Sequence, residues 1–136
     1  MDNEFIIRIP SNKEVVSEIL AFCKKEGIFS AWIQGIGAVN SATLSSYNLD
    51  TKKYQRNNVE GVFELLNLTG NIGTLNGEIT AHLHCTLADQ DMKTYGGHLD
   101  KAVVSITCEV LITKINFKIE RKFDQATGLN LINNAS

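Results

Sequence analysis

Proline is almost missing from this 136-residue sequence, which has only Pro10, and long apolar runs are missing altogether. No apolar stretch approaches the ~20 residues of a membrane-spanning helix, which argues against a membrane partner. The first residues, Met1-Asp2-Asn3-Glu4, also lack the basic start of a secretory signal peptide. We therefore expect a cytoplasmic protein.

Cysteine is scarce too, since only Cys23, Cys85 and Cys108 occur, far apart in the chain. An odd number of scattered cysteines favours neither a disulfide framework nor a CxxC zinc site. Charge of either sign is not in excess, because 13 Lys and Arg face 15 Asp and Glu, for a net charge of -2. This balance gives no bulk attraction to polyanions and counts against DNA binding by the chain alone.

The length and composition are those of one domain. With 136 residues and 43% hydrophobic content, the chain can bury an adequate core. We expect a single domain over residues 1–136, with its core over residues 4–123. The remaining residues, 124–136, are expected to form a C-terminal tail that is loose or packed peripherally.

One main helix is predicted near the N-terminus. Ser11-Asn12-Lys13-Glu14 matches a capping box that would start this helix, and Gly27 would end it. The apolar residues between them recur at helical spacing and would face the core. These are Val15, Ile19, Phe22 and Cys23.

The rest of the chain alternates with a period of two, between clusters of Gly, Asn and Asp. We expect an α+β fold with a mostly antiparallel sheet of about seven strands. The predicted strands cover residues 4–9, 29–36, 41–48, 53–55, 61–69, 78–87 and 107–123. The last of these is long, and its apolar residues Ile115, Phe117, Ile119 and Phe123 are predicted to share a buried face.

The three histidines of the chain are close together in the sequence. His82 and His84 flank one residue in a strand-like run, so both point to the same face of the strand, roughly 6.6 Å apart. His98 follows a loop with Asp89 and Gly96-Gly97, which can reverse the chain and bring a third imidazole back. The alternative is three unrelated histidines in the core or on the surface.

The spacing therefore predicts a metal site made of His82, His84 and His98. Three histidines and a water are a recurrent ligand set of catalytic zinc, and Fe, Ni and Cu also accept imidazole. We take zinc as the expected divalent ion and leave the metal's identity open.

Two glutamates are candidate catalytic residues because their neighbours are apolar. Glu64 lies within Val62-Phe63-Glu64-Leu65-Leu66. Glu109 is two residues before Leu111, so both side chains would point to the same face of a strand. Burial of an unpaired carboxylate is costly, so each side chain needs a partner or an opening. A role as base or metal ligand is one explanation. An ion pair with Arg8, Arg56 or Arg121, or exposure at a strand end, is the other.

Two motif matches are weaker. Gly35-Ile36-Gly37 imitates a dinucleotide-binding loop, but the third glycine is missing and a strand follows instead of a helix, which excludes a Rossmann site. His82-x-His84 with Asp89 and Gly96 resembles the first cupin motif. The second cupin motif contains a glycine, a proline and a histidine. No proline follows Pro10 in this sequence, which counts against a cupin fold.

Taken together, several segments resemble the plant and prokaryote conserved (PPC) domain family, in their order and spacing, over residues 4–123. These segments are Gln34-Gly35-Ile36-Gly37-Ala38-Val39, residues 61–70, His82-Leu83-His84 with Leu87-Ala88-Asp89, Gly96-Gly97-His98-Leu99 and Thr107-Cys108-Glu109-Val110. The resemblance implies a seven-stranded antiparallel sheet that assembles into a homotrimer.

The resemblance also bears on function. It implies that His82, His84 and His98 hold a metal near a subunit boundary, while Glu64 and Glu109 match motif positions without an assigned role. Plant members carry an AT-hook with a Gly-Arg-Pro core, which these 136 residues do not contain.

Two classes of function follow. The first is a trimeric metal-binding protein, or a metal enzyme acting on a small-molecule ligand, whose open coordination position activates water or polarises a carbonyl. The second is a DNA-binding or regulatory module without chemistry. Neither the substrate nor the reaction is set by the sequence.

Overall fold

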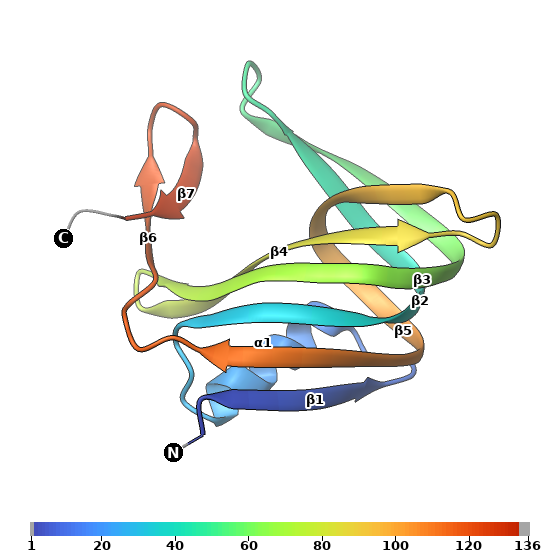
Figure 1. Cartoon of the computed structure of the whole chain (residues 1–136). Helices are drawn as coiled ribbons and strands as arrows, with labels where there is room; N and C mark the ends of the chain where they lie inside the picture. Colours follow the sequence, from blue (N-terminus) through green and yellow to red (C-terminus); the bar gives the residue numbers. More distant parts are fainter. Residues whose placement is uncertain (1, 134–136) are drawn as a thin grey trace.

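The computed structural model describes residues 2–133, and it has seven strands and one helix in that range (Figure 1). In chain order the elements are β1 (Glu4–Pro10), α1 (Val15–Lys25), β2 (Ala31–Asn48), β3 (Lys53–Leu75), β4 (Glu78–Ala88), β5 (Thr94–Lys114), β6 (Glu120–Asp124) and β7 (Leu129–Ile132). The predicted fold, mostly strands with one helix near the N-terminus, is confirmed. None of the helical structure within residues 2–133 has the length and apolar character that a membrane crossing requires.

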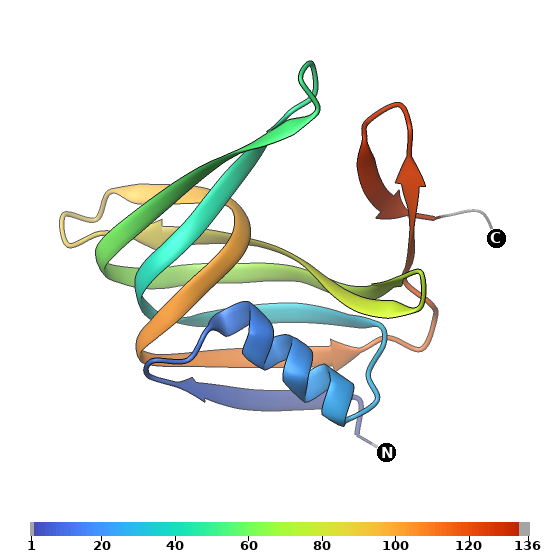
Figure 2. The same cartoon turned by 180° about the vertical axis from the view of Figure 1, so that it is seen from behind.

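The strands form one sheet in the order β1-β5-β2-β3-β6-β7, and β4 pairs with both β3 and β5. Strands β2, β3, β4 and β5 therefore close into a ring. Every pairing is antiparallel except that of β3 with β6. Helix α1 lies across the lower part of this sheet (Figure 2).

The core lies between α1 and the sheet and continues into the ring. Val15, Ile19 and Cys23 of α1 are fully buried, as their spacing predicted, and Phe22 packs against the core. The N-terminal cap differs from the prediction. Glu14 caps the helix: its carboxylate accepts hydrogen bonds from the backbone N–H groups of Val16 and Ser17, at 2.8 and 2.9 Å.

Strands β2 and β3 are each longer than predicted, because bulges bend them without ending them. The segments 29–36 and 41–48 belong largely to β2, whose register shifts between Gly35 and Gly37 and again between Val39 and Ser41. Gly37 permits this bend, since a Cβ there would lie 2.4 Å from the Thr107 carbonyl oxygen.

The predicted strand 107–123 is wrong, because it starts too late and joins parts of two separate strands. Strand β5 begins at Thr94 and ends at Lys114, and β6 begins at Glu120. Between them the chain turns where the Ile119 N–H donates to Ser30 Oγ at 2.8 Å. The expected common buried face fails as well, because Ile119 is buried while Phe117 and Phe123 are 71% and 60% exposed.

Residues 124–136 were expected to form a loose or peripheral tail, and part of this segment pairs as a strand. Strand β7 pairs antiparallel with β6. Asp124 lies opposite Leu129 at one end of this ladder, and Arg121 lies opposite Ile132 at the other. This β6–β7 hairpin stands beside the ring (Figure 1). Tyr47 Oη donates to the Thr127 carbonyl and Lys52 Nζ to the Gln125 carbonyl, which ties the hairpin loop to the β2–β3 hairpin. Residues 134–136 lie outside the described part of the chain.

Candidate metal centre

Strands β4 and β5 bring the three histidines together. His82 and His84 project from one face of β4. Cys85, the next residue along the strand, points to the opposite face and is buried in the core. In the β4–β5 ladder His84 lies directly opposite His98. The chain reverses at residues 89–93, where Asp89 accepts backbone hydrogen bonds from Asp91 and Lys93. The sequence thus predicted the reversal.

The two glycines act differently from the prediction. Gly96 and Gly97 lie within β5 rather than in the turn. Gly97 is close to the neighbouring strand β2, since a Cβ at this position would lie 3.0 Å from the Ser45 carbonyl oxygen. Gly97 therefore lets β5 pack tightly beside β2 just before His98, and Gly96 does the same beside β4, since a Cβ there would lie 3.2 Å from the Cys85 carbonyl oxygen.

The imidazoles form a compact triangle. One ring nitrogen from each histidine lies within 4.8 Å of those of the other two. The ring centroids are 5.0 Å (His82–His84), 5.4 Å (His82–His98) and 5.7 Å (His84–His98) apart. Ligands of a tetrahedral zinc with Zn–N bonds of about 2.0–2.1 Å lie about 3.3 Å apart, so the rings must close by up to about 1.5 Å. The donor set fits a divalent ion such as zinc.

The surroundings keep two of the imidazoles neutral. Burial, the Arg121 guanidinium and the other two histidines lower the pKa of His82 to about 4. Burial also lowers the pKa of His98, with help from His84 and Arg56 and against the opposing effect of Asp100. Neutral imidazole is the form that binds a metal, so both side chains are ready as ligands at neutral pH.

Polar side chains from other strands contact the cluster. Arg121 of β6 donates from Nη2 to Asn71 Oδ1 at 2.7 Å, and the same Nη2 lies 3.4 Å from His82 Nδ1. Asp100 Oδ1 lies 3.7 Å from His98 Nε2. The Tyr54 ring packs beside the His98 ring, with centroids 5.2 Å apart.

A cavity of about 360 Å³ opens next to the cluster. His82 and His98 line one side of it, and Arg121 with residues 128–131 of the β6–β7 hairpin line another. The sequence did not predict that Arg121 and residues 128–131 would line a cavity beside the histidines. Arg121 was considered only as an ion-pair partner for a glutamate, and no local pattern indicates that β6 folds back over β4.

Glu64 and Glu109 lie elsewhere and are not part of the histidine cluster. Both side chains are exposed. Glu64 pairs in register with Ala38 and Ala88, and Glu109 with Arg8 and Ile36. Within residues 2–133 neither glutamate forms an ion pair. They are exposed within β3 and β5 rather than at a strand end, and a catalytic role for them stays a prediction.

Comparison with known proteins gives a family match and several similar structures. The family model for the Plants and Prokaryotes Conserved (PCC) domain matches residues 1–116. A protein from Bacteroides thetaiotaomicron, for which DNA binding has been suggested, is 34% identical with a TM-score of 0.94; the match covers 98% of this chain and 93% of that one. No curated protein sequence matches the chain significantly.

Two further similar structures come from Archaeoglobus fulgidus and Pyrococcus horikoshii. A metal-containing protein from Archaeoglobus fulgidus is 34% identical with a TM-score of 0.91, and the match covers 98% of this chain and 94% of that one. A plant- and prokaryote-conserved (PPC) protein from Pyrococcus horikoshii is 32% identical with a TM-score of 0.91, covering 99% and 94%. The chain belongs to the Plants and Prokaryotes Conserved domain family.

Proposed function

We propose that this protein binds one divalent metal ion per chain, zinc by preference, through His82, His84 and His98. The observation that carries the proposal is the triangle of ring nitrogens within 4.8 Å, built by two paired strands. A chance cluster of histidines would cost stability through desolvation without a compensating partner. The metal-containing relative from Archaeoglobus fulgidus supports the proposal.

Three protein ligands leave room for a further ligand, as in catalytic rather than closed structural zinc sites. A metal in such a site lowers the pKa of a bound water or polarises a carbonyl oxygen. The residues of this chain would hold the ion, keep His82 and His98 neutral, and provide the cavity of about 360 Å³ beside it. We propose a small-molecule ligand or substrate in that cavity.

We further propose that the protein is a homotrimer. The sheet exposes several large apolar side chains that a monomer would leave in water. They include Ile6, Ile36, Val62, Leu66 and Ile106, which are 80%, 55%, 64%, 48% and 69% exposed. Assembly of three copies would cover such a surface, as the family resemblance implies.

Titration of metal-free protein with Co²⁺ tests the metal site directly. Cobalt replaces zinc in nitrogen-ligand sites, and its visible absorption becomes intense when only four or five ligands surround it. We expect one equivalent of Co²⁺ per chain to produce such a band and one equivalent of Zn²⁺ to remove it. A weak octahedral spectrum, unchanged in His84→Ala protein, would refute histidine coordination.

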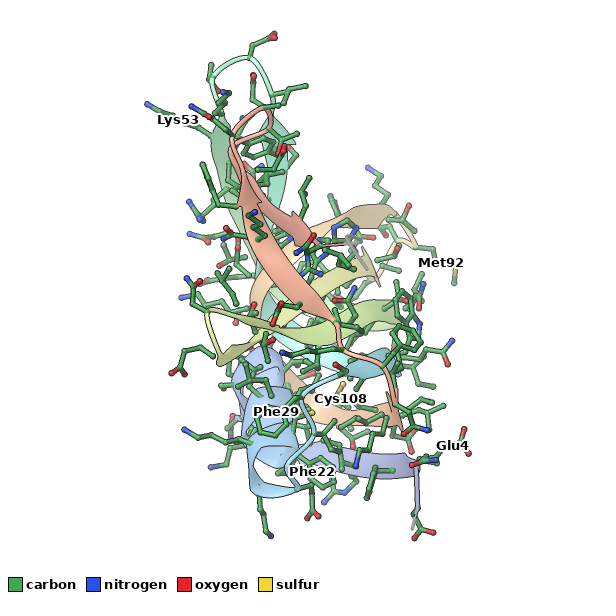
Figure 3. The ribbon with its side chains drawn as sticks, turned by 90° about the vertical axis from the view of Figure 1, so that its left-hand side faces the viewer. Glu4, Phe22, Phe29, Lys53, Met92 and Cys108 are labelled. Atoms are coloured by element: carbon green, nitrogen blue, oxygen red, sulfur yellow. The ribbon has the colours of Figure 1, made fainter. Side chains whose placement is uncertain are left out.

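A DNA-binding or regulatory role is the second proposal, favoured by the suggestion made for the Bacteroides thetaiotaomicron relative. The basic residues of this chain are dispersed, however. Lys53 lies at the far end of the β2–β3 hairpin (Figure 3), and Arg56 is 3.6 Å from Asp100, which offsets its charge. We therefore place the metal function first.

A further inference from the structure

Arg121 is a cation without an anion. Its side chain is half-buried, and within residues 2–133 no carboxylate lies within ion-pair distance of it. Its hydrogen-bond acceptors are neutral: the Asn130 carbonyl at 3.1 Å and Asn71 Oδ1 at 2.7 Å. Partial burial of an uncompensated charge is costly, so the site gains if an anion joins it.

The histidine cluster adds to this excess of positive charge. Three neutral imidazoles do not reduce the charge of a divalent ion. Asp100 is the carboxylate within ion-pair distance of a histidine in the described part of the chain, 3.7 Å from His98. It also lies 3.6 Å from Arg56 Nε, and the positive charge of Arg56 offsets its negative charge. With a metal bound, the ion and Arg121 would therefore both lie close to His82 without an opposing charge.

Arg121 and a metal also compete for His82. An arginine nitrogen is always a donor, so Nη2, 3.4 Å from His82 Nδ1, requires the lone pair of that nitrogen. If a metal takes Nδ1, the lone pair is used; if it takes Nε2, Nδ1 carries a proton and two donors face each other. In both cases metal binding releases Nη2 from His82 and leaves it free for another acceptor.

A place for that acceptor is already formed. The cavity of about 360 Å³ is lined by His82, His98, Arg121 and Tyr54, with Leu75 and Leu131 as apolar walls. Its size is in the range of small-molecule sites, and a few convergent polar groups among apolar ones are typical of them. The β6–β7 wall lies beyond residues 1–116, the part that matches the family model, but within the 98% of this chain that the Archaeoglobus fulgidus relative covers.

We propose that this cavity binds a small molecule bearing an oxyanion, a carboxylate or a phosphate group, which Arg121 holds while a neighbouring oxygen of the same molecule reaches the metal. The inference rests on the proposed metal function, because the ion supplies the second contact and frees the arginine. It also implies positive coupling: metal raises the affinity for the anion, and the anion raises the affinity for metal.

Calorimetric titration tests the proposal in two stages on the full chain. The first stage measures Zn²⁺ binding to wild-type protein and to Arg121→Gln, Arg121→Lys and Arg8→Gln variants. Arg8→Gln is the matched control, since it removes the same charge from an exposed position of β1, outside the cavity. We expect all four proteins to bind one zinc ion.

The second stage titrates the zinc-loaded proteins with glycolate, inorganic phosphate and glycolamide. Glycolamide has nearly the shape of glycolate without its charge. We expect wild type and Arg8→Gln to bind glycolate or phosphate at least roughly tenfold more tightly than Arg121→Gln does, since a charged hydrogen bond is lost. Arg121→Lys should be intermediate because it keeps the charge without the planar fork. Glycolamide binding should be the same in all four.

The outcomes separate the two claims. Preference for glycolate or for phosphate identifies the oxyanion. Normal zinc binding with equal anion affinity in wild type and Arg121→Gln would overturn the inference and leave the metal function intact. Absence of zinc binding in the first stage would refute the proposed function, and the inference with it. A purely structural role of Arg121 would lower glycolamide affinity as much as glycolate affinity, which would also overturn the inference.

Discussion

His82 shows how the surroundings of one residue adjust its chemistry. Its neighbours on β4 and β5 are two more imidazoles, and Arg121 approaches from β6. Burial and this positive neighbour lower the pKa of His82 to about 4, so the ring stays uncharged under conditions that protonate an ordinary histidine. A lowered pKa in the folded state has a direct consequence for stability.

The metal-free protein should lose stability as the pH falls from about 6.5 to about 4. In this window the unfolded chain binds a proton at His82 and the folded chain does not, so protonation favours unfolding; above about 6.5 neither state is protonated there and the effect disappears. Urea denaturation at about pH 7 and pH 4.5 measures it. The His82→Gln variant should lose less stability over this range, and an equal loss in both proteins would show that His82 is not the source.

At the scale of strands, the sequence predicted the histidine site better than the strand boundaries. Alternation of polar and apolar residues sets the face of β4, so His82 and His84 were placed together. Strand ends depended instead on contacts far apart in the sequence. Strand β2 continues past its glycines because bulges bend it without ending it. After β5 the alternation of polar and apolar residues continues in the sequence, but the chain turns there, and the Ile119 N–H bonds to Ser30 Oγ. Arg121 reaches His82 by the same kind of long-range packing.

Gly70 lets β3 and β4 pack closely together beside the histidine cluster. A Cβ on this residue would lie 1.9 Å from the His82 carbonyl oxygen, and its φ of 154° disfavours other residues. Gly70→Ala should therefore move β4, reduce zinc affinity and lower the free energy of unfolding by about 2 kcal/mol or more.

Gly77→Ala is the control for this experiment, measured by urea denaturation and zinc titration. Gly77 also has a positive φ, of 81°, but a Cβ there meets nothing within 4 Å. We expect a loss of about 1 kcal/mol and unchanged zinc affinity. If both variants kept full zinc affinity, close packing of β3 against β4 would not be needed to position the histidines.

On the scale of the whole molecule, the exposed apolar sheet face predicts self-association. Light scattering should give a mass three times the 15.0 kDa of one chain. Ile36→Lys should shift the mass toward the monomer, because a charge would be buried at the interface. Met92→Lys is the control, since Met92 is 85% exposed and projects from the β4–β5 turn (Figure 3). A monomeric mass for wild type at micromolar concentration would refute the trimer.

The whole-molecule charge predicts weak DNA binding. With a net charge of -2 and dispersed basic residues, the protein should bind duplex DNA without sequence preference, at or beyond the weak end of non-specific affinities, a dissociation constant of about 10⁻⁴ M at physiological salt. Fluorescence anisotropy with labelled duplex measures this. Submicromolar binding that is lost when Lys52, Lys53 and Arg56 are changed to alanine would make the DNA-binding role the primary one.

The metal content of protein purified without a histidine tag tests the central claim most directly. Elemental analysis should find about one divalent ion per chain in wild type, zinc before other metals, and little in His84→Ala. His84 is exposed, so its loss should leave the fold intact, which circular dichroism checks. Wild-type protein that takes up no ion after incubation with zinc, or a His84→Ala variant with full metal content, would contradict the account.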